Sequence, residues 1–168
     1  THVTYTATDN KLNVSTCTFD VIVTDASPTI TCVGDQLRNT NSGSCSYQVL
    51  GNELDPTAFS DNCGVETVTW SFTDAETLLT RTGSNTLSGE IIPSGHDTGA
   101  TGQTIINWSV TDISANTSTC SFILTIEDHE APVIVVPGNQ TRNVDLHKNY
   151  YTVTGGEFDD VKATDNCG

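Results

Sequence analysis

The chain has little positive charge: 6 Lys and Arg residues stand against 21 Asp and Glu, for a formal net charge of -15. Binding to nucleic acid needs clustered Lys and Arg that neutralise phosphates, so this composition argues against a nucleic-acid partner. No apolar run approaches the roughly 20 residues of a membrane-spanning helix, and we expect no membrane span in this segment. Met is absent while Thr, Ser, Asn and Gly are abundant, which favours short strands and turns over helices.

The sequence also lacks the common signatures of catalysis. It contains no Gly-x-Ser-x-Gly elbow, no His-Glu-x-x-His motif and no phosphate-binding loop. The segment Ser94-Gly95-His96-Asp97 gathers the residue types of a catalytic triad, but residues adjacent in sequence do not easily form one hydrogen-bonded relay. Its Gly and Pro context indicates a loop. We therefore expect a protein that is not an enzyme.

The two ends of the chain match its interior. The segment 1–25 aligns with 104–128 after a shift of 103 positions, and 28–64 aligns with 132–168 after a shift of 104. A period of about a hundred residues is the size of a domain and too long for a solenoid repeat. We expect the natural polypeptide to continue in both directions. The predicted organisation is the C-terminal part of one module at 1–28, a complete module at 29–132, and the N-terminal part of the next at 133–168.

Six cysteines occur without any Cys-x-x-Cys pair, which makes a zinc site improbable and favours disulfides over metal ligands. Cys32 and Cys45 disappear together from the following module, where Val136 and Asn149 occupy the aligned positions. Two cysteines that vanish together are most simply bonded to each other. We therefore predict a disulfide between Cys32 and Cys45.

The remaining cysteines follow the same repeat. Cys63 aligns with Cys167, and Cys120 aligns with Cys17. We predict a second disulfide between Cys63 and Cys120, with the partners of Cys17 and Cys167 lying outside this segment. Such bonds imply an oxidising compartment outside the cytoplasm. The alternative is that the cysteines are buried free thiols.

Short runs of alternating β-branched and polar residues, bounded by turn residues, predict β-strands. About seven strands per hundred residues without helical periodicity indicate an all-β fold of tandem immunoglobulin-like antiparallel β-sandwich modules. Tyr5, Trp70 and Trp108 are expected to be core residues, and a role in stacking on sugars would require them to be exposed. The predicted strands are Val3–Thr8, Cys17–Thr24, Ser46–Gly51, Val65–Phe72, Ile105–Thr111 and Cys120–Glu127.

Two motifs carry a family resemblance. Thr-Ala-Thr-Asp-(x)3-Asn-(x)3-Cys-x-Phe begins at Thr6, and Glu-Leu-Asp-Pro-Thr-Ala-Phe-Ser-Asp-Asn-Cys-Gly begins at Glu53. With a strand that ends in Asp followed by Pro, the sequence resembles the hyalin repeat (HYR), an immunoglobulin-like extracellular module. It is similar to the long HYR arrays in secreted and surface proteins of Bacteroidetes-type bacteria. The resemblance implies adhesion or surface architecture at the cell surface. The chain departs from the family at Val136 and Asn149, and in a longer loop at 91–103.

Acidic residues supply the best candidate site. In an immunoglobulin-like sandwich, the turns at Asp61 and Asp112 lie at the N-terminal end of the module, where the preceding module ends with Asp25. Carboxylates from three segments suit Ca²⁺, which takes six to eight oxygens, and they would repel one another without a cation. The alternative is that these residues form turns by accepting backbone hydrogen bonds. The same junction recurs downstream as Asp128, Glu130 and Asp165.

These features together predict a non-catalytic structural module of a long extracellular fibre or cell-surface adhesin. It would act as a stalk or spacer whose junctions Ca²⁺ rigidifies, with neighbouring modules of the same chain as its partners. The alternative is a carbohydrate- or ligand-binding module that mediates cell adhesion, in which the loop 91–103 or exposed aromatic side chains grip a surface glycan. A third possibility is that identical fibres bundle laterally into filaments.

Overall fold

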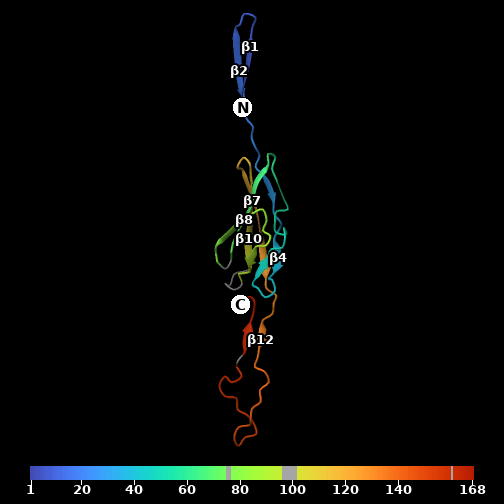
Figure 1. Ribbon diagram of the computed structural model, residues 1–168, viewed down its shortest axis with the longest axis vertical. Helices are drawn as coiled ribbons and strands as arrows, with labels where there is room; N and C mark the ends of the chain where they lie inside the picture. The colour runs from blue at the N-terminus through green and yellow to red at the C-terminus, as the bar shows by residue number, and fades with distance from the viewer. Residues whose placement is uncertain (75–76, 96–101, 160) are drawn as a thin grey trace.

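The computed structural model describes residues 1–74, 77–95, 102–159 and 161–168. The described residues form 13 strands in five sheets and contain no helix, so none could cross a membrane as an apolar helix. The chain is extended along one axis, with a hairpin at one end and the segment that follows β12 at the other (Figure 1). The all-β fold class predicted from the sequence is confirmed, and the arrangement of several sheets is consistent with an immunoglobulin-like β-sandwich.

The central part of the chain is organised by a five-stranded sheet. β10 lies in its middle, and alternate residues of this strand are buried, including Ile106, Trp108 and Val110. Trp108 pairs directly with Trp70 of the neighbouring strand, so both indoles lie on the inner face. β4 runs parallel to β11, and all other pairs are antiparallel. The strand order is β4 (Gln36–Asn39), β11 (Thr117–Glu127), β10 (Gln103–Asp112), β7 (Val65–Thr73) and β8 (Thr80–Ser84).

Two short strand pairs form the second layer of the central part. β3 (Thr29–Thr31) pairs with β6 (Ala58–Ser60), and β5 (Ser46–Gln48) pairs with β9 (Ile91–Pro93). Tyr47 and Ile92 face each other across the second pair and belong to the same buried cluster as the sheet residues. All buried hydrophobic residues of this cluster fall between Tyr47 and Ile126. The apolar core therefore lies entirely within residues 29–132.

The two ends of the chain repeat parts of the central structure. β1 (His2–Thr8) and β2 (Val14–Asp20) form a hairpin, and β12 (Val133–Val135) pairs with β13 (Lys162–Thr164). Tyr5 pairs with Cys17 in the hairpin just as Trp108 pairs with Cys120 in β10 and β11. The expectation that Tyr5 is a core residue is wrong: Tyr5 is 63% exposed, because β1 and β2 form a separate two-stranded sheet. Trp108 packs in the buried cluster of the central part and is 1% exposed.

Strand boundaries follow the predictions in the five-stranded sheet, whereas the predicted strand Ser46–Gly51 is too long, because β5 ends at Gln48. β7, β10 and β11 cover the predicted runs 65–72, 105–111 and 120–127. The predicted strand Cys17–Thr24 is wrong at its C-terminal end, because β2 stops at Asp20. Val21 still exchanges backbone hydrogen bonds with Thr1, but residues 22–24 have no paired strand beside them among the described residues. Alternation therefore marks a potential strand, and pairing decides its length.

Both predicted disulfides are wrong. The structure joins Cys32 to Cys120 and Cys45 to Cys167, with Cα–Cα distances of 5.8 and 4.8 Å. Cys63 is an exposed free thiol. The first bond closes the module on itself by connecting the β3 layer to the five-stranded sheet. The second connects residues 29–132 to the segment 133–168.

The register of the sheet explains why Cys63 does not reach Cys120. Cys120 pairs with Trp108 in the middle of β10. Cys63 lies just before Val65, which pairs with Asp112 at the end of β10. The four residues from Trp108 to Asp112 correspond to about 13 Å along a strand, which is too far for a disulfide.

A similar separation keeps Cys45 from Cys32. Cys32 is held at Cys120, whereas the chain beyond β4 reaches the far end of β11, where Thr40 N donates to Glu127 O at 2.9 Å. The seven residues from Cys120 to Glu127 span about 23 Å in an extended strand. Cys45 follows Thr40 and lies at that far end. The joint absence of the two cysteines from the next module therefore did not mean that they are partners.

Gly83 offers a test of the packing on the inner face. It pairs with Trp70, and a Cβ at this position would lie 2.3 Å from Cζ2 of the indole. Trp70 cannot easily move away, because its Nε1 donates to Thr86 O at 2.8 Å. We expect Gly83→Ala to lower the free energy of unfolding by about 1–3 kcal/mol in denaturant titrations. Gly34→Ala, where a Cβ meets nothing within 4 Å, is the control and should be nearly neutral. Equal effects of the two variants would contradict the packing described.

Candidate functional site

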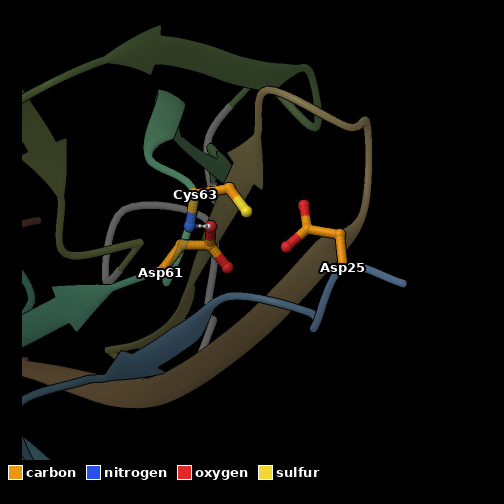
Figure 2. Close-up of side chains that lie close together, drawn as sticks. All are labelled: Asp25, Asp61 and Cys63. Carbon is orange, nitrogen blue, oxygen red and sulfur yellow. Dashed lines mark hydrogen bonds between the residues drawn. The ribbon is translucent and has the colours of Figure 1, made fainter. Parts of the chain in front are cut away.

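The first candidate site lies where the N-terminal hairpin segment meets the central module. Asp25, Asp61 and Cys63 each place a potential ligand atom within 4.8 Å of the others. Asp25 follows β2, whereas Asp61 and Cys63 belong to the turn between β6 and β7. Figure 2 shows the two carboxylates and the sulfur gathered around one small space. The structure thus brings together two of the three carboxylates expected at this junction.

Asp61 forms a turn and also presents a second oxygen. Its Oδ2 accepts hydrogen bonds from Cys63 N at 2.7 Å and Gly64 N at 2.9 Å. Gly64 has a φ of 124°, a conformation that glycine adopts without strain. Oδ1 of Asp61 is buried and accepts no hydrogen bond. Asp61 therefore combines the turn role with one oxygen available to another partner.

Asp25 has the same division between its two oxygens. Oδ1 accepts from Ala26 N at 2.9 Å, and Oδ2 is buried without a hydrogen bond. Donor groups nearby, first the hydroxyl of Ser114 and then the thiol of Cys63, favour the charged carboxylate and lower the pKa of Asp25 despite its partial burial. Asp25 is therefore ionised at neutral pH.

The pKa of Cys63 is shifted in the opposite direction from that of Asp25. Interaction with the nearby Asp25 carboxylate, partial desolvation of the sulfur and the negative charges of Asp25, Asp61 and Asp112 raise the pKa of the thiol, which is still exposed to solvent. The thiol is therefore protonated at neutral pH. Because a metal-bound cysteine must be a thiolate, this environment disfavours a soft-metal site at Cys63.

Asp112, the third predicted ligand, is occupied by its own turn. It is fully buried, and its Oδ1 accepts from Ser114 N at 2.8 Å and Asn116 N at 2.9 Å, while Oδ2 accepts from Asn116 Nδ2 at 2.9 Å. Asp9 accepts the equivalent bonds from Lys11 and Asn13 in the N-terminal hairpin. Asp112 acts on the site through its charge, and its contacts are those of a turn-forming residue.

The second junction connects the central module to the segment 133–168. Asp128 Oδ1 accepts hydrogen bonds from Thr40 Oγ1 at 3.2 Å, Glu130 N at 3.0 Å and Asn166 Nδ2 at 3.2 Å. Glu130 accepts from Ser42 Oγ at 3.0 Å. The acidic residues of this junction are therefore bonded to the loop that follows β4.

The loop 40–45 and the C-terminal segment make further contacts at this junction. Gly43 N donates to Glu130 at 2.6 Å, and Asn166 Nδ2 donates to Ser44 O at 3.2 Å. Asp165 accepts from its neighbour Asn166 N at 2.6 Å. Within the part of the chain that the structure describes, Asp128, Glu130 and Asp165 do not form a compact cluster like that of Asp25, Asp61 and Cys63. Hydrogen bonds and the Cys45–Cys167 disulfide hold this junction together.

Sequence analysis missed the contribution of the loop 40–45. Its Thr, Asn, Ser and Gly residues are typical of any turn, so nothing in their order indicates contacts with a neighbouring module. The one available signal was the alignment of Cys167 with Cys63, which marks both positions as junction cysteines. The predicted bond between Cys63 and Cys120 obscured that signal.

The residues considered for sugar binding or catalysis occupy other positions. Trp70 and Trp108 are 5% and 1% exposed, and their ring N–H groups donate to Thr86 O and Leu54 O. They are core residues, as expected. The segment Ser94-Gly95-His96-Asp97 and the loop 91–103 include residues 96–101, which lie outside the described residues.

Comparison with known proteins gives limited similarity. No known family profile matches the chain. It is similar to the "Sushi, von Willebrand factor type A, EGF and pentraxin domain-containing protein 1" of Rattus norvegicus and of Mus musculus, with 30% identity over 141 residues in each case. The match covers 82% of this chain but 3% of either relative, so the chain spans a small fraction of their length. These mammalian relatives give no support to the expected bacterial source.

The charge of Asp25 provides a test of the first junction. Because donors near the carboxylate favour its ionised form, Asp25 should titrate below the ordinary value of 3.8. Its contribution to stability is present above that pH and is lost as the pH falls through the lowered pKa. We expect Ser114→Ala to shift the pKa of Asp25 upward in an NMR titration of the carboxyl carbon. The exposed Ser27 provides the control variant, Ser27→Ala, which should leave it unchanged. No change with Ser114→Ala would refute the assigned cause.

Proposed function

We propose that the chain is a non-catalytic stalk or spacer, a hyalin-repeat-like segment of a long extracellular fibre or cell-surface adhesin. The observation that carries the proposal is the second junction. There a disulfide between Cys45 and Cys167, together with hydrogen bonds from Asn166 Nδ2 to Ser44 O and to Asp128, attaches one module to the beginning of the next. An attachment at several points suits a module that adds a fixed length to a fibre and carries tension along it.

Other properties of the chain support the same function. Two disulfides fit an oxidising compartment outside the cytoplasm. The net charge of -15 keeps an extended surface soluble and discourages non-specific association. The relatives are named for several domain types, which fits a repeat module within a longer protein. The absence of catalytic motifs from the sequence supports a role that does not depend on chemistry.

The ligand-binding alternative has weaker support. Aromatic rings that stack on sugars must be accessible, and both tryptophans of the central module are buried, which leaves Phe59, 46% exposed, as the accessible ring of that module among the described residues. The proposal of a spacer therefore takes precedence over that of a glycan-binding module. Lateral bundling of identical fibres is compatible with a spacer, and the spacer proposal does not depend on it.

The spacer proposal predicts how length depends on the number of modules. Inserting additional copies of residues 29–132 between Pro132 and Val133 should lengthen the particle by a constant increment, because each junction fixes the next module in the same way. Electron microscopy of chains with zero, one and two extra copies measures this increment. The same chains should not bind a glycan array. Collapsed particles of unchanged length, or glycan binding that increases with copy number, would overturn the proposal.

We also propose that Ca²⁺ rigidifies the first junction by binding Asp25 and Asp61. Oδ2 of Asp25 and Oδ1 of Asp61 are buried carboxylate oxygens without hydrogen bonds, which is the chemistry that a hard divalent cation prefers. Two protein oxygens leave the remaining positions to water. We therefore expect weak affinity, roughly 10⁻⁴–10⁻³ M, as in other extracellular modules.

Calorimetry and thermal unfolding test the calcium proposal. Millimolar Ca²⁺ should raise the melting temperature, and excess chelator should reverse the change, since a ligand that binds the folded state stabilises it. The double variant Asp25→Asn, Asp61→Asn should lose this response. Glu66→Gln removes an exposed carboxylate from the adjacent strand and should retain it. A response that is identical in all three proteins would rule out this site.

A further inference from the structure

The two junction cysteines occupy equivalent positions but differ in bonding. Cys167 lies 104 positions after Cys63, and each follows the same Asp-Asn pair. Cys167 is bonded to Cys45 of the module before it. Cys63 is an exposed free thiol at the corresponding end of its own module. Cys167 and Cys63 therefore occupy the same position in successive modules, but only Cys167 has a disulfide partner in this chain.

The polar groups around the two cysteines differ in the same way. At the second junction, Asn166 Nδ2 donates to Ser44 O and to Asp128, which also accepts from Thr40. Asn62 aligns with Asn166; its Nδ2 donates to the adjacent Cys63 sulfur at 3.2 Å, and its side chain is one of the donor groups beside Asp25, but it has no partner from a loop like 40–45 among the described residues. Asp25 aligns with Asp128, and its Oδ2 is buried without a hydrogen bond.

The contacts at the second junction indicate which partner would fit the unbonded groups at the first junction. Its partner is the loop 40–45, which supplies a hydroxyl to Asp128, a carbonyl to Asn166 and a sulfur to Cys167. An oxygen that can accept and an amide that can donate are available at the aligned positions of the first junction. The exposed thiol of Cys63 completes the set.

We infer that Asn62 and Cys63 form a docking site for the loop 40–45 of a preceding copy of this module, closed by a disulfide from that copy's Cys45 to Cys63. Asp25 lies on the side of the preceding module, in the place of its Asp128. This inference rests on the proposed tandem function and names the partner of the free thiol. A chain of such modules is then covalently connected through its side chains at each of these junctions, in addition to its backbone. Pulling two modules apart requires reduction of the bond.

Formation of the bond needs an oxidant that itself carries a disulfide. The thiolate of the incoming Cys45 attacks that disulfide, forms a mixed disulfide and releases one thiolate of the oxidant. Cys63 gives its proton to water, and its thiolate then attacks the Cys45 sulfur and displaces the second thiolate. Two cysteine thiols are thereby oxidised to one disulfide, and the oxidant is reduced to two thiols.

The remaining cysteines are consistent with this assignment. Cys17 aligns with Cys120, which is bonded within its module to Cys32, so Cys17 belongs to the internal bond of the preceding module. Asn149 stands at the position of Cys45 in the module that begins at Val133. That module therefore cannot make the same bond to a successor. The cross-link is a property of particular junctions.

A chain with one inserted copy of residues 29–132 after Pro132 tests the inference. The insertion preserves the spacing, because Val133 aligns with Thr29. The present chain has two free thiols, Cys17 and Cys63. With the inserted copy, the inference predicts that two remain, because Cys45 of the first copy bonds to Cys63 of the second. Without that bond four would be free, namely those two plus the first Cys45 and the second Cys63. Maleimide labelling before reduction counts them by mass.

A variant identifies the bonded pair. With Cys63→Ser in the first copy and Cys45→Ser in the second, the remaining Cys45 is in the first copy and the remaining Cys63 is in the second. A disulfide between a Cys45 peptide and a Cys63 peptide must then cross the new junction. Peptide mapping without reduction should recover these two peptides joined. In the control, Cys45→Asn in the first copy reproduces the residue found at 149 and should leave Cys63 of the second copy open to alkylation. Recovery of the Cys32–Cys120 peptide pair verifies folding in each protein.

The result separates this inference from the spacer proposal. Four free thiols in a folded chain, or alkylation of Cys63 in the second copy when Cys45 is present in the first, would overturn the disulfide. Constant growth in length with four free thiols would overturn the disulfide and leave the spacer proposal standing. Two free thiols without growth in length would support the disulfide and count against the spacer.

Discussion

The pairing of β10 with β7 on one side and β11 on the other is the constraint on which the rest of the structure depends. β10 presents Ile106, Trp108 and Val110 to the core, and Trp108 faces Trp70 across the strand pair. A shift of one residue would move these side chains to the outer face and expose them to water. Since burial of large apolar and aromatic side chains dominates the stability of such a small core, the register has no close competitor.

This register also assigns the polar residues to the two ends of the module. Asp112 ends β10 beside the turn that carries Asp61 and Cys63, and Glu127 ends β11 beside the loop 40–45. The two ends therefore carry complementary groups: acceptors, an amide and a thiol at one, and a loop with a hydroxyl, a carbonyl and a cysteine at the other. Complementary groups at two different ends suit the proposed head-to-tail connection of modules, which extends a chain instead of closing a pair.

The excess of acidic residues is accommodated by local donors. Asp112 and Asp61 accept backbone N–H groups of their own turns, and Asp128 and Glu130 accept donors from the loop 40–45 of their own module. Each such bond replaces a hydrogen bond to water that the carboxylate loses on folding, so the negative charges cost less than their number suggests. The acidic composition thereby serves turns and junctions, and it keeps the outer surface soluble.

Local chemistry was sufficient to predict the all-β class, the main strands at 65–72, 105–111 and 120–127, the burial of both tryptophans and the meeting of Asp25 with Asp61. Alternation, turn residues and the internal repeat are all readable along the chain. The cysteine pairs and the contacts of the loop 40–45 were decided only by tertiary structure. A disulfide depends on which strand ends coincide in space, and Cys45 meets Cys167 across 122 residues because sheet register and module order bring them together.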